Sequence, residues 1–410
     1  MVSISNNNLK PVVIVALITA VSLFGDSMLY VALPIHWEDA GLASLLEVGI
    51  LLSANRFIRL PFNPLISWLY RKVSVRSGLL FAVFISGITT LSYGFANGFF
   101  VWLILRCIWG IAWSFFRLGA YFMILDLSSN QNRGHFMGTY NGLYRLGSLI
   151  GMLAGGAFVD LFGMREVAVV FGILAFLVLP VVFYHVPNSK SKAFESQKMD
   201  EVKVKKQPIL LWTLTSAFLV MLCLEGMFTA ILSHLIDTRL QTGIHVLGMV
   251  VGAATLAGGL QASRWAVGPF LSPWVGKQSD GKWGRRPFLV GSLLLSSVFM
   301  ASINFDLPFG LWLLNIFVIL LVSSILATVL GAYASDITSG TSRAATMTLY
   351  VIVVDVGASF GPVLGYLSER FIGLTLTFWI SAFILFLLSM GWVFSAKLKL
   401  DAGIPAISHN

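Results

Sequence analysis

Apolar stretches as long as a membrane-spanning helix recur along the whole chain. Each can cross the ~30 Å of bilayer hydrocarbon as about 20 helical residues. Charged residues make up only 11% of the 410 residues, whereas they make up roughly a quarter of a typical soluble protein. The chain is therefore predicted to be an all-α membrane protein that crosses the bilayer many times.

We predict twelve transmembrane helices in two sets of six. They cover residues 11–35, 47–70, 78–97, 100–126, 136–161, 167–186, 208–234, 244–275, 288–306, 310–335, 344–368 and 372–396. The predicted organisation is an N-terminal six-helix bundle over 1–186, a cytoplasmic linker over 187–207, a C-terminal six-helix bundle over 208–396 and a cytoplasmic tail over 397–410. Only one cation, Lys10, precedes the first apolar segment, and no small-residue cleavage site stands out there, so we expect a retained first helix.

The basic residues indicate which loops face the cytoplasm. With the N-terminus inside, eighteen of the 27 lysines and arginines fall in cytoplasmic segments and only Arg165, Arg239 and Arg370 fall in outer loops. Cytoplasmic loops of membrane proteins are enriched in lysine and arginine. We therefore expect a cell-membrane protein with both termini in the cytoplasm. The net charge of +9 then reflects topology, so the expected macromolecular surroundings are the lipid bilayer and not a nucleic acid.

No pattern typical of a cofactor or an enzyme is present. Cys107 and Cys223 both lie in apolar segments and suggest buried small side chains, not a disulfide framework or a metal cluster. The phosphate-binding Gly-x-x-x-x-Gly-Lys and the zinc-binding His-Glu-x-x-His patterns are absent from the sequence. We expect no catalytic residue, no metal and no cofactor, and we expect a proton gradient to supply the energy.

The two halves of the chain repeat each other. A shift of 210 residues lays Asp126 on Asp336 and Arg133 on Arg343, and a shift of 208 pairs "ANRFIRLPF" with "ASRWAVGPF". In that second match Arg56 corresponds to Arg264. Transporters built from two similar halves place the substrate site between the repeats, near the middle of the bilayer.

The chain resembles the major facilitator superfamily over essentially its whole length, and one loop carries a signature of that family. That family has a Gly-x-x-x-Asp…Gly-Arg-Arg loop between helices 8 and 9, and this chain has "GKQSDGKWGRRP", one residue longer than the usual spacing. The resemblance implies two six-helix bundles and gating roles for Asp280, Arg285 and Arg286. The equivalent loop after the second helix departs from the pattern, because Tyr70 takes the aspartate position and Ser74 the glycine position.

Two further motifs resemble those of proton-coupled members. Arg106 and Gly110 in "LRCIWGIAW" resemble an Arg-x-x-x-Gly motif whose arginine is implicated in proton transfer. The segments "GSLIGMLAGG" and "GASFGPVLG" resemble the glycine-rich motif of antiporters. Close helix packing is the structural alternative for these glycines, and antiport is what the resemblance suggests.

Charged residues inside the spans give the clearest functional signal. Six arginines remain after the loops are assigned, against three acids, Asp26, Glu225 and Asp355. The arginines are Arg56, Arg59, Arg106, Arg117, Arg145 and Arg264. A lone arginine in mid-span costs ~2.5–3.5 kcal/mol on insertion scales, so these side chains are expected to face a wet cavity or a partner. An excess of arginine over acid favours an anionic substrate.

Arg56 and Arg264 are predicted to hold a carboxylate or phosphate from the two halves, because a guanidinium binds such groups through paired hydrogen bonds. Arg145 and Trp113 are further substrate-binding candidates. Phosphate and organic-anion members of the resembling family use a comparable arginine pair. The structural alternative is that Arg56 and Arg264 bond backbone carbonyls near the prolines that follow them.

Other charged residues are candidates for gating and proton coupling. Asp355 can pair with Arg56 or Arg59 across the halves, as a gate or as a static ion pair. Asp26 and Glu225 lie on corresponding helices of the two halves. A buried carboxylate near an arginine can bind and release a proton as its surroundings change, so Asp26, Glu225 and Arg106 are the coupling candidates.

The resulting prediction is a monomeric, proton-coupled exporter of a small amphipathic anionic metabolite that works by alternating access. Three alternatives remain open: a multidrug/proton antiporter for cationic or neutral compounds, a flippase for lipids or lipid-linked sugars, and a sensor or scaffold that does not transport. In the antiporter alternative, Asp26 and Glu225 hold the cation.

Overall fold

The computed structural model describes residues 6–128, 132–190, 208–240, 244–246, 249–279, 284–337 and 342–397. The helices in the first half are α1 (Asn6–Ser22), α2 (Phe24–Ala32), α3 (Leu45–Phe57), α4 (Arg59–Tyr70), α5 (Val75–Tyr93), α6 (Phe99–Leu127), α7 (Arg133–Phe162), α8 (Met164–Leu177) and α9 (Leu179–His185). Those in the second half are α10 (Pro208–Val220), the π-helix η2 (Met221–Phe228), α11 (Thr229–Leu240), α12 (Ala253–Ser279), α13 (Arg285–Ser302), α14 (Phe309–Asp336) and α15 (Ser342–Lys397).

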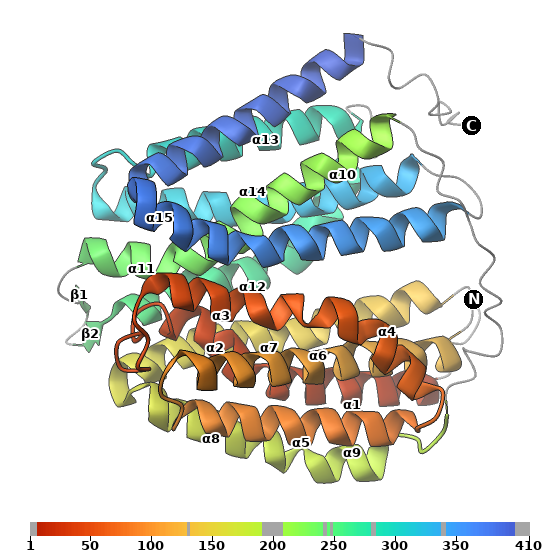
Figure 1. Ribbon diagram of the computed structural model, residues 1–410. Coiled ribbons are helices and arrows are strands. Elements are labelled where there is room, and N and C mark those ends of the chain that lie inside the picture. The colour runs from red at the N-terminus through yellow and green to blue at the C-terminus, as the bar shows by residue number, and fades with distance from the viewer. Residues whose placement is uncertain are drawn as a thin grey trace. The chain divides into compact units, whose positions relative to one another are not determined.

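The predicted all-α architecture of twelve membrane helices is confirmed (Figure 1). Several spans consist of two or three consecutive helical segments, such as α1 with α2 and α10 with η2 and α11. The last two spans form one continuous assignment, α15, which turns at Gly373, where φ is +77°. Among the described residues, eight helical stretches are long and apolar enough to cross a bilayer.

The predicted start of the eighth helix at residue 244 is wrong. Strand β1 (Ile244–Val246) pairs antiparallel with β2 (Met249–Val251), and α12 begins only at Ala253. This stretch is rich in β-branched residues and ends at Gly252. Valine and isoleucine favour extended backbone, and hydropathy alone does not separate such a run from the start of a helix.

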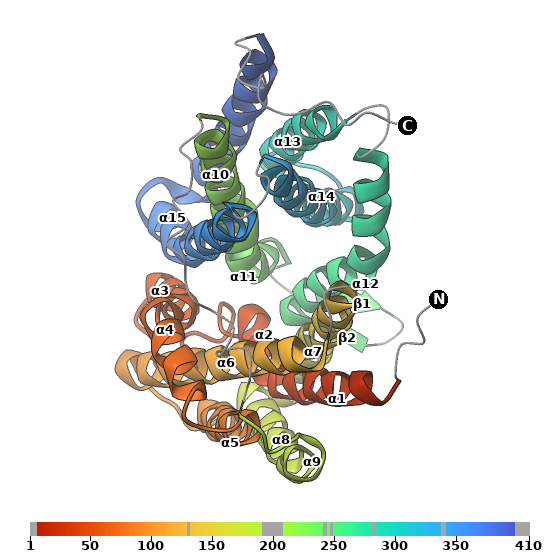
Figure 2. The same ribbon diagram turned by 90° about the vertical axis from the view of Figure 1, so that its right-hand side faces the viewer.

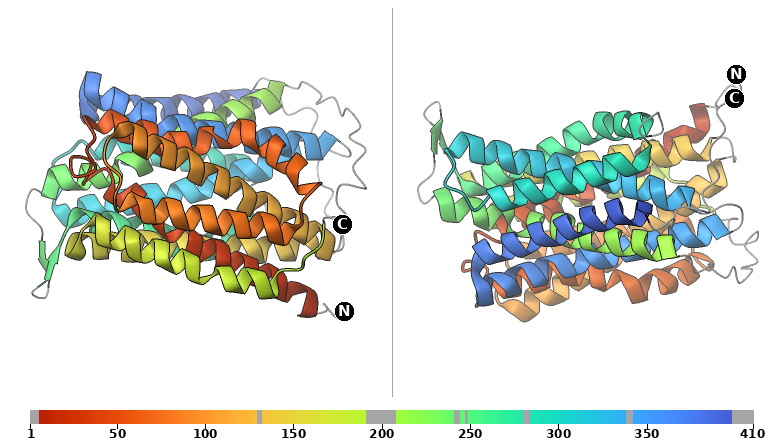
Figure 3. Two further views of the ribbon diagram at one scale, coloured as in Figure 1. Left: turned by 60° about the horizontal axis from the view of Figure 1, so that its bottom comes forward. Right: turned by 90° about the horizontal axis from the view of Figure 1, so that it is seen from above.

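The chain divides into two compact units whose boundaries differ from those of the sequence repeat. Unit 1 comprises the described parts of 1–198 and 230–266, and unit 2 comprises those of 199–229 and 267–410. The predicted domain boundaries at 186, 207 and 396 remain a prediction. Within unit 1, α5 lies beside both α6 and α8 (Figures 1 and 3), and Figure 2 also shows α5 next to α8.

Glycines bring the helices of each half into backbone contact. A Cβ on Gly147 would lie 2.2 Å from the carbonyl oxygen of Ala20, so α7 packs directly on α1. In the repeat-related position, a Cβ on Gly357 would lie 2.5 Å from the carbonyl oxygen of Phe218, so α15 packs on α10. Small residues permit such approach between membrane helices. The glycine-rich motifs therefore have a packing role in both halves.

Candidate functional site

A buried ion pair joins α2 to α6. Arg106 is 0% exposed and its guanidinium contacts the carboxylate of Asp26, which is 6% exposed. Asn55 donates its side-chain N–H to the same carboxylate oxygen over 2.8 Å, and the Nε of Arg106 donates to the backbone oxygen of Leu51 over 3.2 Å. Two of the three predicted coupling residues are thus in direct contact, and α3 supplies further partners to both.

The Arg-x-x-x-Gly spacing explains how Arg106 reaches this position. A Cβ on Gly110 would lie 2.4 Å from the backbone oxygen of Asn55, so only glycine lets α6 approach α3 this closely. Residues four apart lie on the same face of a helix. Arg106 therefore enters the same contact one turn away and meets Asp26 and Leu51 there.

The ion pair continues into a polar and aromatic chain. Arg59 donates its Nη2 to the Oδ1 of Asn55 over 2.5 Å, and its guanidinium lies 5.4 Å from the ring centre of Trp113. Trp113 in turn contacts Tyr144 edge-on. Asn55, which links Asp26 to Arg59, was not predicted, and its one signal was an amide beside Arg56 in an apolar helix.

Two arginines in unit 1 lie against a single indole. The guanidiniums of Arg145 and Arg264 are 5.3 Å and 4.6 Å from the ring centre of Trp265. The indole N–H of Trp265 is buried and has no acceptor among the described residues. A cation above an indole is attracted by the ring's electron density. We call Arg145, Arg264 and Trp265 the arginine–tryptophan cluster.

Arg56 also lies against an aromatic residue. Its Nε donates to the hydroxyl of Tyr30 over 3.2 Å, and its guanidinium lies 5.8 Å from the ring centre. Tyr30 is buried on α2, and its backbone oxygen accepts a hydrogen bond from Ser233 of α11. The predicted pairing of Arg56 with Arg264 around an anion, and its pairing with Asp355, remain predictions.

The charges within the spans are distributed unevenly. All six arginines assigned to the spans lie in unit 1, and of the three span acids only Asp26 lies there. The sequence has no acidic residue from 48 to 125, the segment that contains α4 and α5 and most of α3 and α6. Among the charged residues that the sequence assigns to the spans, unit 1 therefore holds more arginine than acid.

Glu225 of unit 2 lies on the π-helix η2. Its carboxylate accepts a hydrogen bond from the hydroxyl of Ser323 on α14 over 2.7 Å, and its backbone oxygen accepts one from Thr229 over 2.6 Å. The π-helical segments of proteins are rare and frequently coincide with functional sites. Ser323 was not predicted, because nothing in its apolar sequence context distinguishes it from other helix serines.

Two of the predicted gating residues in the loop motif, Arg285 and Arg286, contact other helices of unit 2. Arg285 forms an ion pair with Asp336, and Arg286 donates its Nε to the backbone oxygen of Trp392 over 3.0 Å. Asp280 lies outside the described residues. Tyr70, at the aspartate position of the resembling motif, donates its hydroxyl to the backbone oxygen of Phe115 over 2.8 Å. Tyr70 thus ties α4 to α6 within unit 1.

A further acid joins α7 to α12 inside unit 1. The Oδ2 of Asp160 accepts hydrogen bonds from the backbone N–H of Thr255 over 2.8 Å and from its hydroxyl over 2.5 Å. A carboxylate at a helix N-terminus satisfies N–H groups that have no partner within the helix. A Cβ on Gly156 would lie 2.3 Å from the backbone oxygen of Ala254, so the two helices touch beside this bond.

Comparison with known proteins supplies the family context. The sequence pattern of the Major Facilitator Superfamily matches residues 15–277 and 265–405. The chain is 26% identical over 383 residues to Multidrug resistance protein MdtG of Proteus mirabilis (strain HI4320), covering 90% of this chain and 92% of the relative.

Solved transporters share the fold at low sequence identity. A bacterial homologue of the human lysosomal transporter Spinster, inward-facing and unoccupied, matches with a TM-score of 0.75 and 16% identity, over 98% of this chain and all of that one. A D-xylose–proton symporter matches with a TM-score of 0.72 and 14% identity, over 93% of this chain and 96% of that one.

Proposed function

The chain belongs to the major facilitator superfamily, and from that premise we propose that it is a proton-coupled exporter of small amphipathic molecules that carry a carboxylate or a phosphate. It is a multi-pass membrane protein and a secondary transporter. The proposal includes a monomer in the cell membrane with both termini in the cytoplasm. It also includes a proton gradient as the sole energy source, with no bound cofactor.

The buried Asp26–Arg106 pair carries the proton-coupling part of this proposal. Removing the charge on the carboxylate leaves Arg106 without its counter-charge in a site from which water is excluded, and an uncompensated buried charge is costly. Arg106 must then find another partner or a wetter position. Proton binding at Asp26 therefore changes which arrangement of α2, α3 and α6 has the lowest free energy. An ion pair on the protein surface would couple much more weakly.

The excess of arginine in unit 1 supports the anionic substrate. A guanidinium offers a planar fork of donors that matches carboxylate and phosphate oxygens. In the arginine–tryptophan cluster, two such forks lie near one indole ring. This combination suits a molecule with an anionic group next to an apolar or aromatic portion. Trp113 and Arg59 offer a second pairing of the same kind.

Export is favoured over uptake by the similarity to the Proteus mirabilis relative, which is called a multidrug resistance protein. A second candidate function, antiport of cationic or neutral drugs, draws on Glu225. This carboxylate lies on a π-helix and accepts from the neutral hydroxyl of Ser323. In that case Glu225 would bind the cationic drug, and the arginines would serve structure and gating.

Flux measurements in proteoliposomes test the proposal. A panel of anionic, neutral and cationic amphiphiles is offered to the reconstituted protein under an imposed pH gradient, with internal pH followed by a dye. We expect only anions to drive proton movement. The substitutions Arg145→Gln and Arg264→Gln should weaken anion transport at least tenfold, while Arg165→Gln, which removes an outer charge near Phe95, should leave it unchanged.

Two outcomes would overturn parts of the proposal separately. If cations alone drive proton movement and the cluster variants retain it, the anion assignment fails and the drug-antiporter function replaces it. If anions are transported without any proton movement, the coupling assignment to Asp26 and Arg106 fails, while the substrate class remains.

A further inference from the structure

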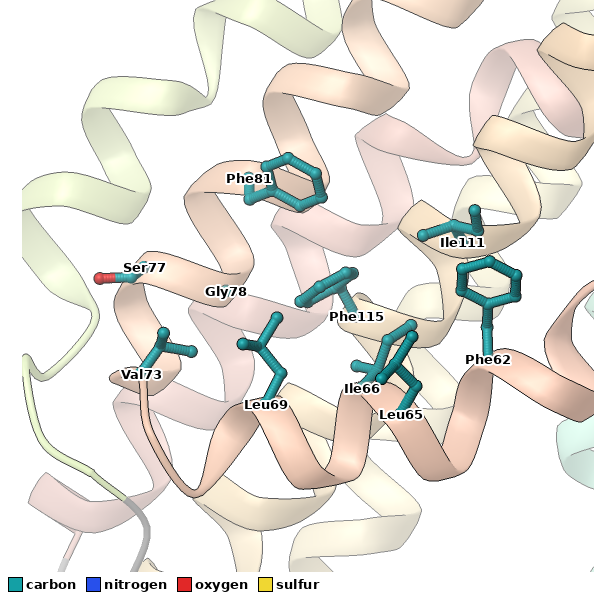
Figure 4. A pocket seen from close by; sticks show the side chains of 10 residues that line it. All are labelled: Phe62, Leu65, Ile66, Leu69, Val73, Ser77, Gly78, Phe81, Ile111 and Phe115. Carbon is teal, nitrogen blue, oxygen red and sulfur yellow. The ribbon is translucent and has the colours of Figure 1, made fainter.

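An apolar groove runs between α4, α5 and α6 in unit 1 (Figure 4). Its volume is about 380 Å³, and Leu69 and Phe81 face it from neighbouring helices with Phe115 between them. The lining residues are Phe62, Leu65, Ile66, Leu69, Val73, Ser77, Gly78, Phe81, Ile111 and Phe115. Among them Ser77 has the only polar side chain, and its hydroxyl is already bonded to that of Ser74.

The described part of the chain leaves this groove open at the surface. Leu65 is 52% exposed and Phe81 47% exposed. Both lie on helices of a protein that crosses the membrane, so hydrocarbon is the medium that meets them. A concave apolar surface of this kind accepts an acyl chain more readily than a flat helix face, because more of the chain is in contact.

One end of the groove carries positive charge. Arg71 and Lys72 follow the last residue of α4 and are exposed, and the Lys72 ammonium lies 3.9 Å from the ring centre of Trp68. Tryptophan and lysine in this arrangement are typical of the level of the lipid headgroups. No acidic residue occurs in the sequence between Glu47 and Asp126, so nothing in this segment opposes an anion at the rim.

The second half of the chain repeats the arrangement. A groove of about 500 Å³ lies between α12 and α13 in unit 2, lined by Trp274, Gln278, Pro287, Phe288, Gly291, Ser292 and Leu295. A shift of 210 residues carries Ser77 onto Pro287 and Phe81 onto Gly291, so the two grooves occupy repeat-related positions. Lys277 is exposed at the same end of this groove.

A third apolar groove has an acid next to its cation and serves as a comparison. It lies between α7 and α8, measures about 460 Å³ and includes Phe162, Val170 and the acidic Glu166. The turn from α7 to α8 lies at the opposite end of the bundle from the turn between α4 and α5, because successive helices alternate in direction. The exposed Arg165 directly precedes Glu166 at this turn, so the rim of this groove carries both signs of charge.

We propose that the α4–α5 groove and its α12–α13 counterpart each bind one anionic phospholipid. An acyl chain lies in the groove, and the phosphate is held by Arg71 and Lys72 in unit 1 and by Lys277 in unit 2. A soluble phosphate compound would use the cations but leave the groove empty. A neutral phospholipid would use the groove but gain little from the cations. The site thus selects for both parts of an anionic lipid.

The experiment compares lipid binding to the purified, delipidated full-length protein. Phosphatidylglycerol and phosphatidylcholine with identical acyl chains are added in detergent, and bound lipids are counted by native mass spectrometry. We expect two phosphatidylglycerol molecules to be retained in preference to phosphatidylcholine. Each rim cation contributes about a fivefold preference, so Arg71→Gln/Lys72→Gln should abolish one preferred site and Lys277→Gln the other.

A matched pair of variants tests the groove itself. Leu65→Trp partly fills the α4–α5 groove, and Val170→Trp does the same in the α7–α8 groove from an equally exposed position, since both residues are 52% exposed. Only Leu65→Trp should release lipid. Equal retention of the two phospholipids, unchanged preference in the rim variants, or equal effects of both tryptophans would overturn the proposal. If a variant is too unstable to purify, the wild type decides, because the preference must fall as salt is raised. Glycerol phosphate without acyl chains should not compete.

Discussion

Gly110 lies directly against the backbone oxygen of Asn55, and a Cβ at this glycine would approach that oxygen to 2.4 Å. The closeness of α6 and α3 at this point is what allows Arg106 to reach Asp26. We therefore expect Gly110→Ala to destabilise the protein by about 1–3 kcal/mol, as overpacked cores are, and to slow proton-coupled transport. Thermal unfolding in detergent and proton flux in proteoliposomes measure the two effects.

A control distinguishes this steric effect from the general effect of replacing a helical glycine. Gly142 on α7 has no atom within 4 Å of the position where a Cβ would lie. Gly142→Ala should be neutral or stabilise by up to ~1 kcal/mol, since alanine favours a helix more than glycine does. If Gly110→Ala behaves like Gly142→Ala, the close contact of α6 with α3 is not needed.

The Asp26–Arg106 pair predicts a difference between single and double substitutions. Asp26→Asn leaves Arg106 buried without its counter-charge, which costs roughly 3–5 kcal/mol. Asp26→Asn/Arg106→Gln removes both charges and should recover most of that stability. It should not recover proton coupling, because no titrating carboxylate remains at this position. A double variant that still couples export to proton movement would place the coupling residue elsewhere.

The hydrogen bond from Ser323 is expected to hold the Glu225 carboxylate in place. Ser323→Ala removes a hydrogen bond to this carboxylate and should cost about 1.5–3 kcal/mol, the range for bonds to charged groups. The hydroxyl of the neighbouring Ser324 donates to the backbone oxygen of Leu320 and not to a carboxylate, so Ser324→Ala is the matched control. Denaturation midpoints of the two variants give the comparison. Equal midpoints would mean that Glu225 does not depend on Ser323.

The hydrogen bonds that Asp160 accepts from Thr255 are expected to stabilise the start of α12. In Asp160→Ala the N–H of Thr255 loses its acceptor, and loss of such a cap costs about 0.5–2 kcal/mol. Hydrogen exchange over residues 253–258 should therefore become faster, while exchange in α5 should stay the same. Glu166→Gln changes a nearby acid without touching this bond and serves as the control. Unchanged exchange in Asp160→Ala would show that other contacts hold this end of α12.

Much of the fold could be predicted from the sequence, because hydropathy indicates the membrane spans and the basic residues indicate the loops between them. The contact between Asp26 and Arg106 could not be predicted from the sequence, because it depends on how α2 and α6 are rotated about their axes. Arg145 and Arg264 were both candidates, but their shared contact with Trp265 required the packing of α7 on α12. The start of α12 was misplaced because β-branched residues satisfy hydropathy in a strand as well as in a helix.

Asn55 and Asp160 show a different limit of prediction from sequence. Each is a single polar residue whose sequence neighbours resemble those of many others, and each gains importance only from a residue distant in the chain. Tyr70 is an intermediate case. The loop motif singles it out in the sequence, because it takes the aspartate position. Its hydrogen bond to Phe115 was not predictable, since it requires that Gly78 and Gly119 leave room for the ring.

The π-helix η2 has a mechanical consequence. A π-turn contains an extra residue compared with an α-turn, so its conversion to α-helix would swivel one end of the helix against the other by about 100°, the angle per residue. Glu225 lies within this segment, and the division between the two compact units falls at Thr229 and Ala230, directly after its last residue, Phe228. Because Glu225 lies within η2, a change of one residue in winding would turn its carboxylate toward a different neighbour.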